Sequence, residues 1–167
     1  MLLVGGASTR FGSPKALAAF EGETLAGRAW RLLGEACTER IAVGKRAEGL
    51  PLGFDLLDDG TPVRAALAGL VAGLRAATTD VCVVVPVDCP RLSVEALHRL
   101  VGACLDAAVP QTGPLPGAYR KSALQLLERR IASGDLALYR ALQELEVRVV
   151  ELDEKLLANV NSPADLL

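Results

Sequence analysis

The sequence predicts an α/β fold, in which a mostly parallel sheet lies between two layers of helices in a three-layer αβα sandwich. Short apolar runs, typical of strands, alternate along the chain with segments of helical period. The most apolar run, residues 81–87 (VCVVVPV), lies between Asp80 and Asp88. Because this run is apolar at successive positions, it would be buried on both faces, as a central parallel strand covered by helices is.

The elements of the first half follow from an N-cap and from periodicity. Thr24 has the side chain of a helix N-cap. The second predicted helix has an apolar residue at i, i+3, i+4 and i+7, the pattern of an amphipathic helix, at Leu67, Leu70, Val71 and Leu74. The predicted strands are residues 2–4, 40–43 and 54–57, and the predicted helices are residues 24–36 and 64–77.

In the second half of the chain, capping residues mark the starts of the predicted helices. Ser93 is the predicted cap of one helix, while Ser122 and Gln125 have the spacing of a capping box at a later helix that ends near Gly134. Ser162 is followed by a proline, as at the start of a helical turn. The remaining predictions are helices over residues 93–105 and 136–145, a loop over 110–117 and a strand over 147–152.

Length and charge restrict the class of protein. The chain has 167 residues, which fits one domain with a sizeable core, and a formal net charge of −2. Without a broad basic surface it is not expected to bind nucleic acid or an anionic membrane, so any phosphate binding must be local. The longest uncharged run, residues 107–119, contains three prolines and is too short to span a membrane. No signal peptide is recognisable, and we expect a cytoplasmic protein.

The cysteine and histidine content argues against two kinds of site. His98 is the only histidine, and no cysteine pair has C-x-x-C spacing. A zinc site and a Ser-His-Asp or Cys-His nucleophile are therefore not expected. Cys82 and Cys104 fall in apolar patterns and are predicted to be buried thiols. The four cysteines are Cys37, Cys82, Cys89 and Cys104.

The loop after the first strand predicts a phosphate-binding site. Its glycines let backbone N–H groups approach a ligand, and its two cations, Arg10 and Lys15, can meet a polyanion. The spacing excludes a P-loop, since five residues separate Gly6 from Gly12 and Lys15 is followed by Ala16. A G-x-G-x-x-G fingerprint is also absent. On these residues alone, the alternative is a glycine-rich surface turn with incidental charges.

Carboxylates follow two further predicted strands. Asp58 and Asp59 come after the third strand, and Asp88 comes after the central strand. In open α/β sheets ligands bind at the carboxyl ends of the strands, and Mg²⁺ takes one or two carboxylates together with substrate phosphates. The loop and these carboxylates together predict a site for a nucleotide and Mg²⁺. Taken singly, each Asp reads equally well as a turn former or cap, above all Asp59 before Gly60, and Lys15 reads equally well as a surface lysine.

Segments along nearly the whole chain resemble one enzyme family. Residues 3–15 (LVGGASTRFGSPK) closely resemble the L-A-G-G-x-S-x-R-M-G-x-x-K signature of MobA-like nucleotidyltransferases, which relatives using other nucleotides share. Residues 85–90 (VPVDCP) resemble the metal-binding strand end of the molybdenum cofactor guanylyltransferases. Residues 115–120 (LPGAYR) and 159–165 (NVNSPAD) resemble their P-L-P-G-L-Y-R and N-[IV]-N-[ST]-P-x-[DE] segments. The resemblance implies one nucleotidyltransferase domain over residues 1–167, with the Rossmann-like, mostly parallel but mixed sheet of nucleotide-diphospho-sugar transferases.

The resemblance also implies roles for individual positions. Catalytic roles fall on three polar side chains, Arg10, Lys15 and Asp88. Asp88 is the implied Mg²⁺ ligand, and Asn159 and Asn161 match positions near the pterin substrate. The implied nucleotide-binding positions are Leu3, Val4, Gly5, Gly6, Lys15, Asp58 and Asp88.

The implied reaction transfers GMP from GTP to molybdopterin, forms a guanine dinucleotide cofactor and releases pyrophosphate. Mg²⁺ is the implied cofactor, and other proteins of the cofactor pathway are implied partners. The chain departs from the family at Gly44, where these enzymes often carry an asparagine near the base, and over residues 65–69, where they usually read G-P-L-A-G. The alternatives are a nucleotidyltransferase that uses CTP or another phosphate acceptor, and a non-catalytic nucleotide-binding module in cofactor delivery.

Overall fold

Seven strands form one mixed sheet in the computed structural model, which describes residues 1–5 and 14–166. The order across the sheet is β5-β4-β1-β6-β8-β7-β9. These strands are β1 (Leu2–Val4), β4 (Ala42–Gly44), β5 (Leu57–Asp58), β6 (Val81–Pro86), β7 (Ala107–Pro110), β8 (Gly117–Arg120) and β9 (Val147–Val150). β5, β4, β1 and β6 are mutually parallel, whereas β8 runs antiparallel to both β6 and β7. The carboxyl ends of the four parallel neighbours therefore lie at one edge of the sheet.

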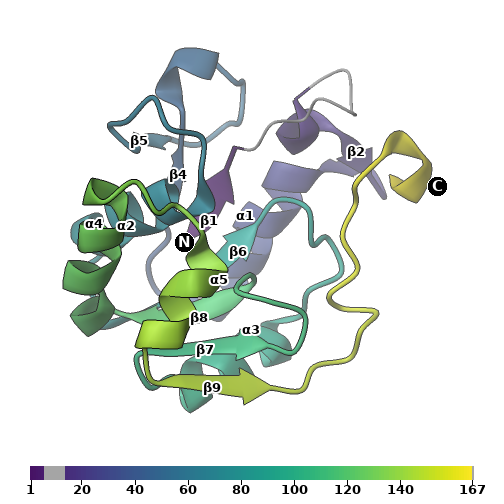
Figure 1. Cartoon of the computed structure of the whole chain (residues 1–167). Coiled ribbons are helices and arrows are strands. Elements are labelled where there is room, and N and C mark those ends of the chain that lie inside the picture. Colours follow the sequence, from purple (N-terminus) through teal and green to yellow (C-terminus); the bar gives the residue numbers. More distant parts are fainter. Residues whose placement is uncertain (6–13, 167) are drawn as a thin grey trace.

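Helices cover both faces of this sheet (Figure 1). On one face α1 packs against α3, and on the other α2 packs against α4, which gives the predicted αβα sandwich. The α-helices are α1 (Leu25–Ala36), α2 (Ala66–Ala76), α3 (Val94–Ala103), α4 (Leu124–Ala132) and α5 (Leu138–Ala141). The 3₁₀ helices are η1 (Lys15–Leu17), η2 (Arg46–Glu48), η3 (Lys121–Ala123), η4 (Leu142–Glu144) and η5 (Pro163–Leu166). A separate hairpin pairs β2 (Ala19–Phe20) with β3 (Glu23–Thr24).

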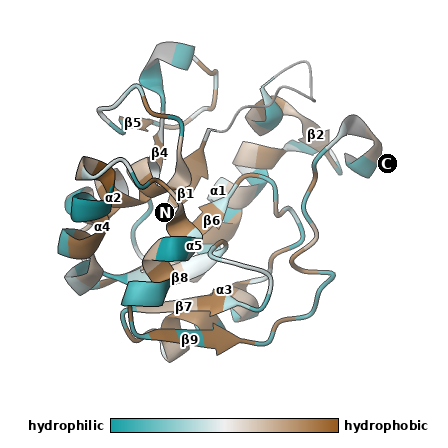
Figure 2. Cartoon of the chain, in the orientation of Figure 1, coloured by the Kyte–Doolittle hydropathy of each residue, from teal (hydrophilic) through white to brown (hydrophobic). Residues whose placement is uncertain are grey.

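The central strands are apolar on both faces, as the sequence predicts. Leu2 and Val4 of β1 lie in the core beneath α1 and α3, while Leu3 between them lies in the core beneath α2 and α4. β6 alternates in the same way, with Val85 on the first face and Val84 on the second. Figure 2 shows both strands in brown at the centre of the molecule. None of the described helices is long and apolar enough to cross a membrane.

The helix caps agree with the sequence at two of three positions. The side chains of Thr24 and Ser93 each accept a hydrogen bond from the backbone N–H three residues on, at 3.0 and 3.2 Å. The capping box at Ser122 is wrong, because Ala123 occupies the N-cap of α4. The Ser122 hydroxyl instead lies 3.2 Å from a carboxylate oxygen of Asp106, which precedes β7. A long-range partner has therefore replaced the local cap.

The loop predicted over residues 110–117 is present, but it connects two antiparallel strands, β7 and β8, that the sequence analysis did not predict. Ala108 of β7 pairs with Ala118 of β8, and Tyr119 of β8 pairs with Cys82 of the central strand. Tyr119 is fully buried, and its hydroxyl donates a hydrogen bond to Pro114 O at 2.6 Å. Both strands are short and contain mostly small residues, so they lack the run of branched side chains that marks a strand in sequence.

The edge strand β5 is also shorter than predicted. It comprises Leu57–Asp58 alone. Phe54 lies outside it and stacks its ring on that of Trp30, with the ring centroids 4.4 Å apart. The remaining predicted elements are present, with ends that differ by a few residues. Cys82 and Cys104 are buried, as expected.

Candidate functional site

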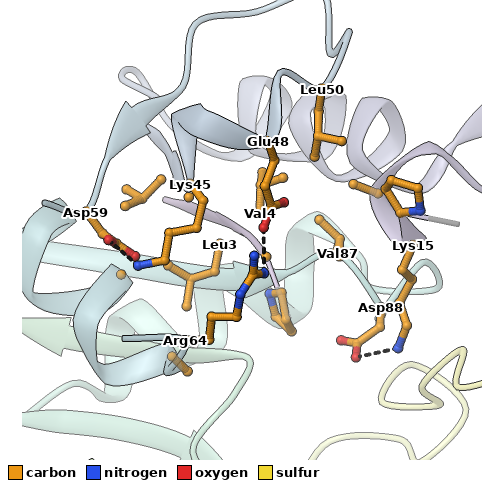
Figure 3. Close-up of a pocket in the computed structure, with 18 of the residues that line it drawn as sticks. Leu3, Val4, Lys15, Lys45, Glu48, Leu50, Asp59, Arg64, Val87 and Asp88 are labelled. Atoms are coloured by element: carbon orange, nitrogen blue, oxygen red, sulfur yellow. Dashed lines mark hydrogen bonds and ion pairs between the residues drawn. The ribbon is translucent and has the colours of Figure 1, made fainter. Parts of the chain in front are cut away.

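A cavity of about 720 Å³ opens at the carboxyl edge of the parallel strands (Figure 3). Leu3, Val4 and Gly5, at the end of β1, line it. The ends of β4 and β6 and the start of α2 contribute its other walls. Its volume is typical of a small-molecule site, and its place at the strand ends is where open α/β sheets bind ligands.

Lys15 and Asp88 meet at one end of this cavity. Lys15 Nζ lies 3.3 Å from Asp88 Oδ2. Lys15 opens η1, which the buried Ala16 anchors in the core, and Asp88 follows β6. The two side chains are 17% and 26% exposed, so a ligand can reach them while they remain partly shielded from water. Such shielding strengthens their attraction for phosphate and for a cation.

The chemistry of Asp88 fits a magnesium ion that is shared with a substrate. Within the described part of the chain, no group of three or more His, Cys, Asp or Glu side chains could hold a metal ion. Mg²⁺ does not require such a group, because it commonly binds one or two carboxylates and completes its shell with water and substrate phosphates. Asp88 together with a bound triphosphate therefore fits this ion.

The backbone turns away from β1 at Gly5. Its φ is 152°, a value that L side chains rarely adopt. The predicted phosphate-binding positions Gly6 and Arg10 fall within residues 6–13, outside the residues that the structure describes. The two described flanks of that segment, Gly5 and Pro14, both line the cavity.

Gly44 lets β4 approach β1 closely beside the cavity. A Cβ atom at this position would lie 2.0 Å from Val4 O, which no real side chain could tolerate. The asparagine that similar enzymes often carry here is therefore incompatible with this strand packing. Position 44 therefore contributes no side chain to the cavity.

Lys45 fixes the wall of the cavity next to Gly44. Its Nζ lies 2.6 Å from Asp59 Oδ1 and 2.7 Å from Val63 O, and it also contacts Thr61 O. The side chains of Lys45 and Asp59 are only 15% and 6% exposed. Three oxygen partners use all three donors of an ammonium group, so Lys45 ties the chain after β5 to the end of β4.

The two adjacent carboxylates after β5 occupy different places. Asp59 lines the cavity, whereas Asp58 is not among the described lining residues. Asp58 accepts hydrogen bonds from the backbone N–H groups of Gly60 at 2.8 Å and Arg46 at 2.9 Å. These bonds, that of Gly60 first, lower the pKa of Asp58 below its usual value. Asp58 thus caps a turn, which was the alternative to a binding role, and Asp59 faces the cavity.

Another charged pair lines the cavity beside Lys45 and Asp59. Arg64 Nη1 is 2.6 Å from Glu48 Oε1, and both residues line the cavity (Figure 3). Glu48 ends η2, and Arg64 lies just before α2. Neither residue belongs to a recognisable motif and only the tertiary fold brings them together, so the sequence alone does not predict them.

The C-terminal segment is attached to the end of β6. The Cys89 thiol donates a hydrogen bond to Asn159 Oδ1 at 2.9 Å, and the backbone N–H of Val160 donates to Asp88 O at 2.8 Å. Val160 is buried in a small cluster with Phe20 of β2. Asn159, a predicted pterin contact, therefore lies beside the predicted metal ligand.

Asn161, the second predicted pterin contact, begins the final turn. Its backbone N–H and that of Ser162 donate to Asp165 Oδ2, both at 2.8 Å. These hydrogen bonds lower the pKa of Asp165. The side chain of Asn161 is exposed and remains accessible to a ligand.

Known proteins resemble this chain in sequence and in fold. A family model described as the MobA-like NTP transferase domain matches residues 1–151. A protein of Rhodopirellula baltica named probable molybdenum cofactor guanylyltransferase is 32% identical over 186 residues, which cover 99% of this chain and 88% of that protein.

Solved structures extend the resemblance to three dimensions. Molybdopterin-guanine dinucleotide biosynthesis protein A from Archaeoglobus fulgidus is 27% identical with a TM-score of 0.80, covering 99% of this chain and 93% of that one. A 2-C-methyl-D-erythritol 4-phosphate cytidylyltransferase from Thermus thermophilus shares the fold, with a TM-score of 0.75 at 20% identity and the same coverage of both chains. The site at the strand ends and the family match over most of the sequence show that the chain belongs to the MobA-like NTP transferase family.

Proposed function

We propose that this chain transfers the GMP moiety of GTP to molybdopterin and releases pyrophosphate. The supporting observation is the junction at Asp88, whose carboxylate contacts Lys15 and whose backbone carbonyl binds Val160. One residue thus joins the cavity to the segment that resembles the pterin-binding part of guanylyltransferases. Relatives named probable molybdenum cofactor guanylyltransferase support this choice of substrates.

The proposed reaction needs no protein nucleophile. An oxygen of the molybdopterin phosphate attacks the α-phosphorus of GTP, and the bond from that phosphorus to the β-phosphate oxygen breaks. Lys15 lies where it can neutralise charge on the triphosphate and on the departing pyrophosphate. Catalysis then consists of positioning and charge stabilisation. Mg²⁺, held by Asp88 and the phosphates, supplies further positive charge when bound.

The other site residues take supporting roles in this proposal. Leu3, Val4 and Gly5 line the cavity, and in this proposal they contact the nucleoside. In this proposal Asn159 and Asn161 contact the pterin. The roles of Gly6 and Arg10, the cytoplasmic location and the pathway partners stay predictions from the sequence.

The proposal is tested with purified protein, molybdopterin, Mg²⁺ and one of GTP, CTP or ATP. We expect dinucleotide and pyrophosphate in equal amounts with GTP, and neither product when molybdopterin or Mg²⁺ is omitted. A preference for CTP would show that the protein transfers a cytidylyl group instead of a guanylyl group. Nucleotide binding without pyrophosphate release under any condition would favour a non-catalytic module.

A further inference from the structure

In Figure 3 the Glu48–Arg64 ion pair lies between the Lys15–Asp88 pair on one side of the cavity and the Lys45–Asp59 pair on the other. Glu48 comes from the turn after β4, and Arg64 comes from the segment that leads into α2. Their 2.6 Å contact therefore joins two separate walls of the cavity.

The position of this pair suits the base of a bound nucleotide; this step rests on the proposed function. With the triphosphate at Lys15 and Asp88, the nucleoside has to extend across the end of β1 towards β4. Neighbouring strands lie roughly 4.8 Å apart, so the ends of β6 and β4, on either side of β1, are about 10 Å apart. That span is comparable to the length of a nucleoside, which places the base beside Glu48 and Arg64.

The neighbouring charged side chains, Lys45 and Asp59, already hydrogen-bond to protein groups. Lys45 donates to three oxygens, and Asp59 Oδ1 accepts both from Lys45 and from the backbone N–H of Thr61. By contrast, the Arg64 side chain is 54% exposed and that of Glu48 is 24% exposed. Exposed ion pairs add little stability, so a ligand can exchange for such a contact.

We propose that Glu48 and Arg64 read the guanine base. The carboxylate of Glu48 accepts hydrogen bonds from N1–H and from the 2-amino group of guanine, and the guanidinium of Arg64 donates to O6 and N7. This arrangement matches two donors and two acceptors on adjacent edges of one base. Adenine presents an acceptor at N1, which a carboxylate repels, and cytosine has only its 4-amino group to donate. The pair therefore performs the selection that Gly44 cannot.

The first test is Glu48→Gln in the full chain, with Kd measured by calorimetry for GTP and for ITP, which lacks the 2-amino group. We expect the substitution to weaken GTP binding by roughly 10- to 100-fold, the range of a lost bidentate base contact, and to weaken ITP binding less. Glu128→Gln is the matched control, because it breaks an exposed ion pair of 2.7 Å with Arg75, and neither residue lines the cavity. It should leave both Kd values unchanged.

The second test separates base reading from support of the cavity wall. The double variant Glu48→Arg/Arg64→Glu restores an ion pair with the charges exchanged. If the pair only holds the walls together, GTP binding recovers in this variant, and the inference is overturned. We expect a normal unfolding midpoint with GTP binding still weak, since donors and acceptors now face the wrong edges of guanine.

The two proposals fail in different ways. Wild-type protein that shows no binding of GTP overturns the proposed function, and base reading with it. The other case is that the wild type prefers GTP and the Glu48→Gln variant keeps the same preference for GTP over ITP. That result overturns only the proposal that Glu48 and Arg64 read the base.

Discussion

The Cys89 thiol hydrogen-bonds Asn159 Oδ1 at 2.9 Å, across 70 positions of sequence. Burial, and then the nearby charge of Asp88, raise the pKa of Cys89 to about 12. The thiol consequently stays protonated at neutral pH and keeps its proton for donation. It holds the predicted pterin contact at a fixed place beside the end of β6.

We therefore expect Cys89→Ala to raise the KM for molybdopterin while the KM for GTP stays constant. The loss of one such hydrogen bond is worth about 1 kcal/mol, or roughly fivefold in affinity. Cys89→Ser keeps a donor and should recover most of the effect. Steady-state kinetics with each substrate varied in turn would test this, and an equal rise in both KM values would contradict a role in placing Asn159.

Lys15→Ala and Asp88→Asn should each lower turnover by about 10²- to 10³-fold, the usual loss when one charge-stabilising group is removed. Asp88→Asn should also raise the Mg²⁺ concentration that gives half-maximal rate. Lys155→Ala, at an exposed lysine outside the cavity lining, is the control and should behave as wild type. Unchanged pyrophosphate release in either site variant would remove that residue from the proposed mechanism.

Gly44→Ala should destabilise the protein by about 3 kcal/mol, because the added carbon would overlap Val4 O and force β4 from β1. Gly102→Ala in α3 is its matched control, since a Cβ there meets no atom within 4 Å. Alanine is a better helix former than glycine, so this variant should gain about 0.5 kcal/mol. Urea unfolding of both variants measures the difference, and equal midpoints would contradict the close strand contact.

The lowered pKa of Asp58 predicts a stability that depends on pH. A carboxylate whose folded pKa lies below its unfolded value stabilises the protein fully above that unfolded value, near 3.8, and loses the contribution as pH falls through the folded pKa. Asp58→Asn should therefore lower the unfolding midpoint at pH 6 and flatten its decline below pH 4. If the unfolding midpoints of the variant and the wild type change in parallel with pH, the two backbone hydrogen bonds of Asp58 add no pH-dependent stability.

The sequence alone predicts the features that local patterns determine. The continuous apolar run of β6 and the caps at Thr24 and Ser93 are present, because burial on two faces and N-cap hydrogen bonds leave a mark within a few residues. Because parallel strands end at one edge of a sheet, the sequence also predicts that Lys15 and Asp88 lie close together, and in the structure they are in contact. Their roles in catalysis stay predictions.

Features that depend on long-range pairing could not be predicted from the sequence alone. β8 is a strand because Tyr119 and its neighbours pair with β6, although its four residues show no strand pattern of their own. Which of two successive carboxylates faces the cavity depends on the backbone direction at the end of β5. The resemblance implies a nucleotide contact for Asp58, whereas in the structure Asp59 lines the cavity. The contact of Glu48 with Arg64 likewise exists only once β4 and α2 are packed side by side.

The placement of β1 between β4 and β6 has a consequence for biosynthesis. Leu2 pairs with Ala42 on one side and with Val85 on the other, so an early strand has one neighbour that is synthesised much later. At about 5–20 residues per second, β1 lacks this neighbour on the ribosome for a time on the order of seconds. Pairing across such a separation is also slow, because a long loop must close first. A nascent chain that ends before β6 would therefore have neither Asp88 nor a completed cavity, and capacity to hold a nucleotide would arise only late in folding.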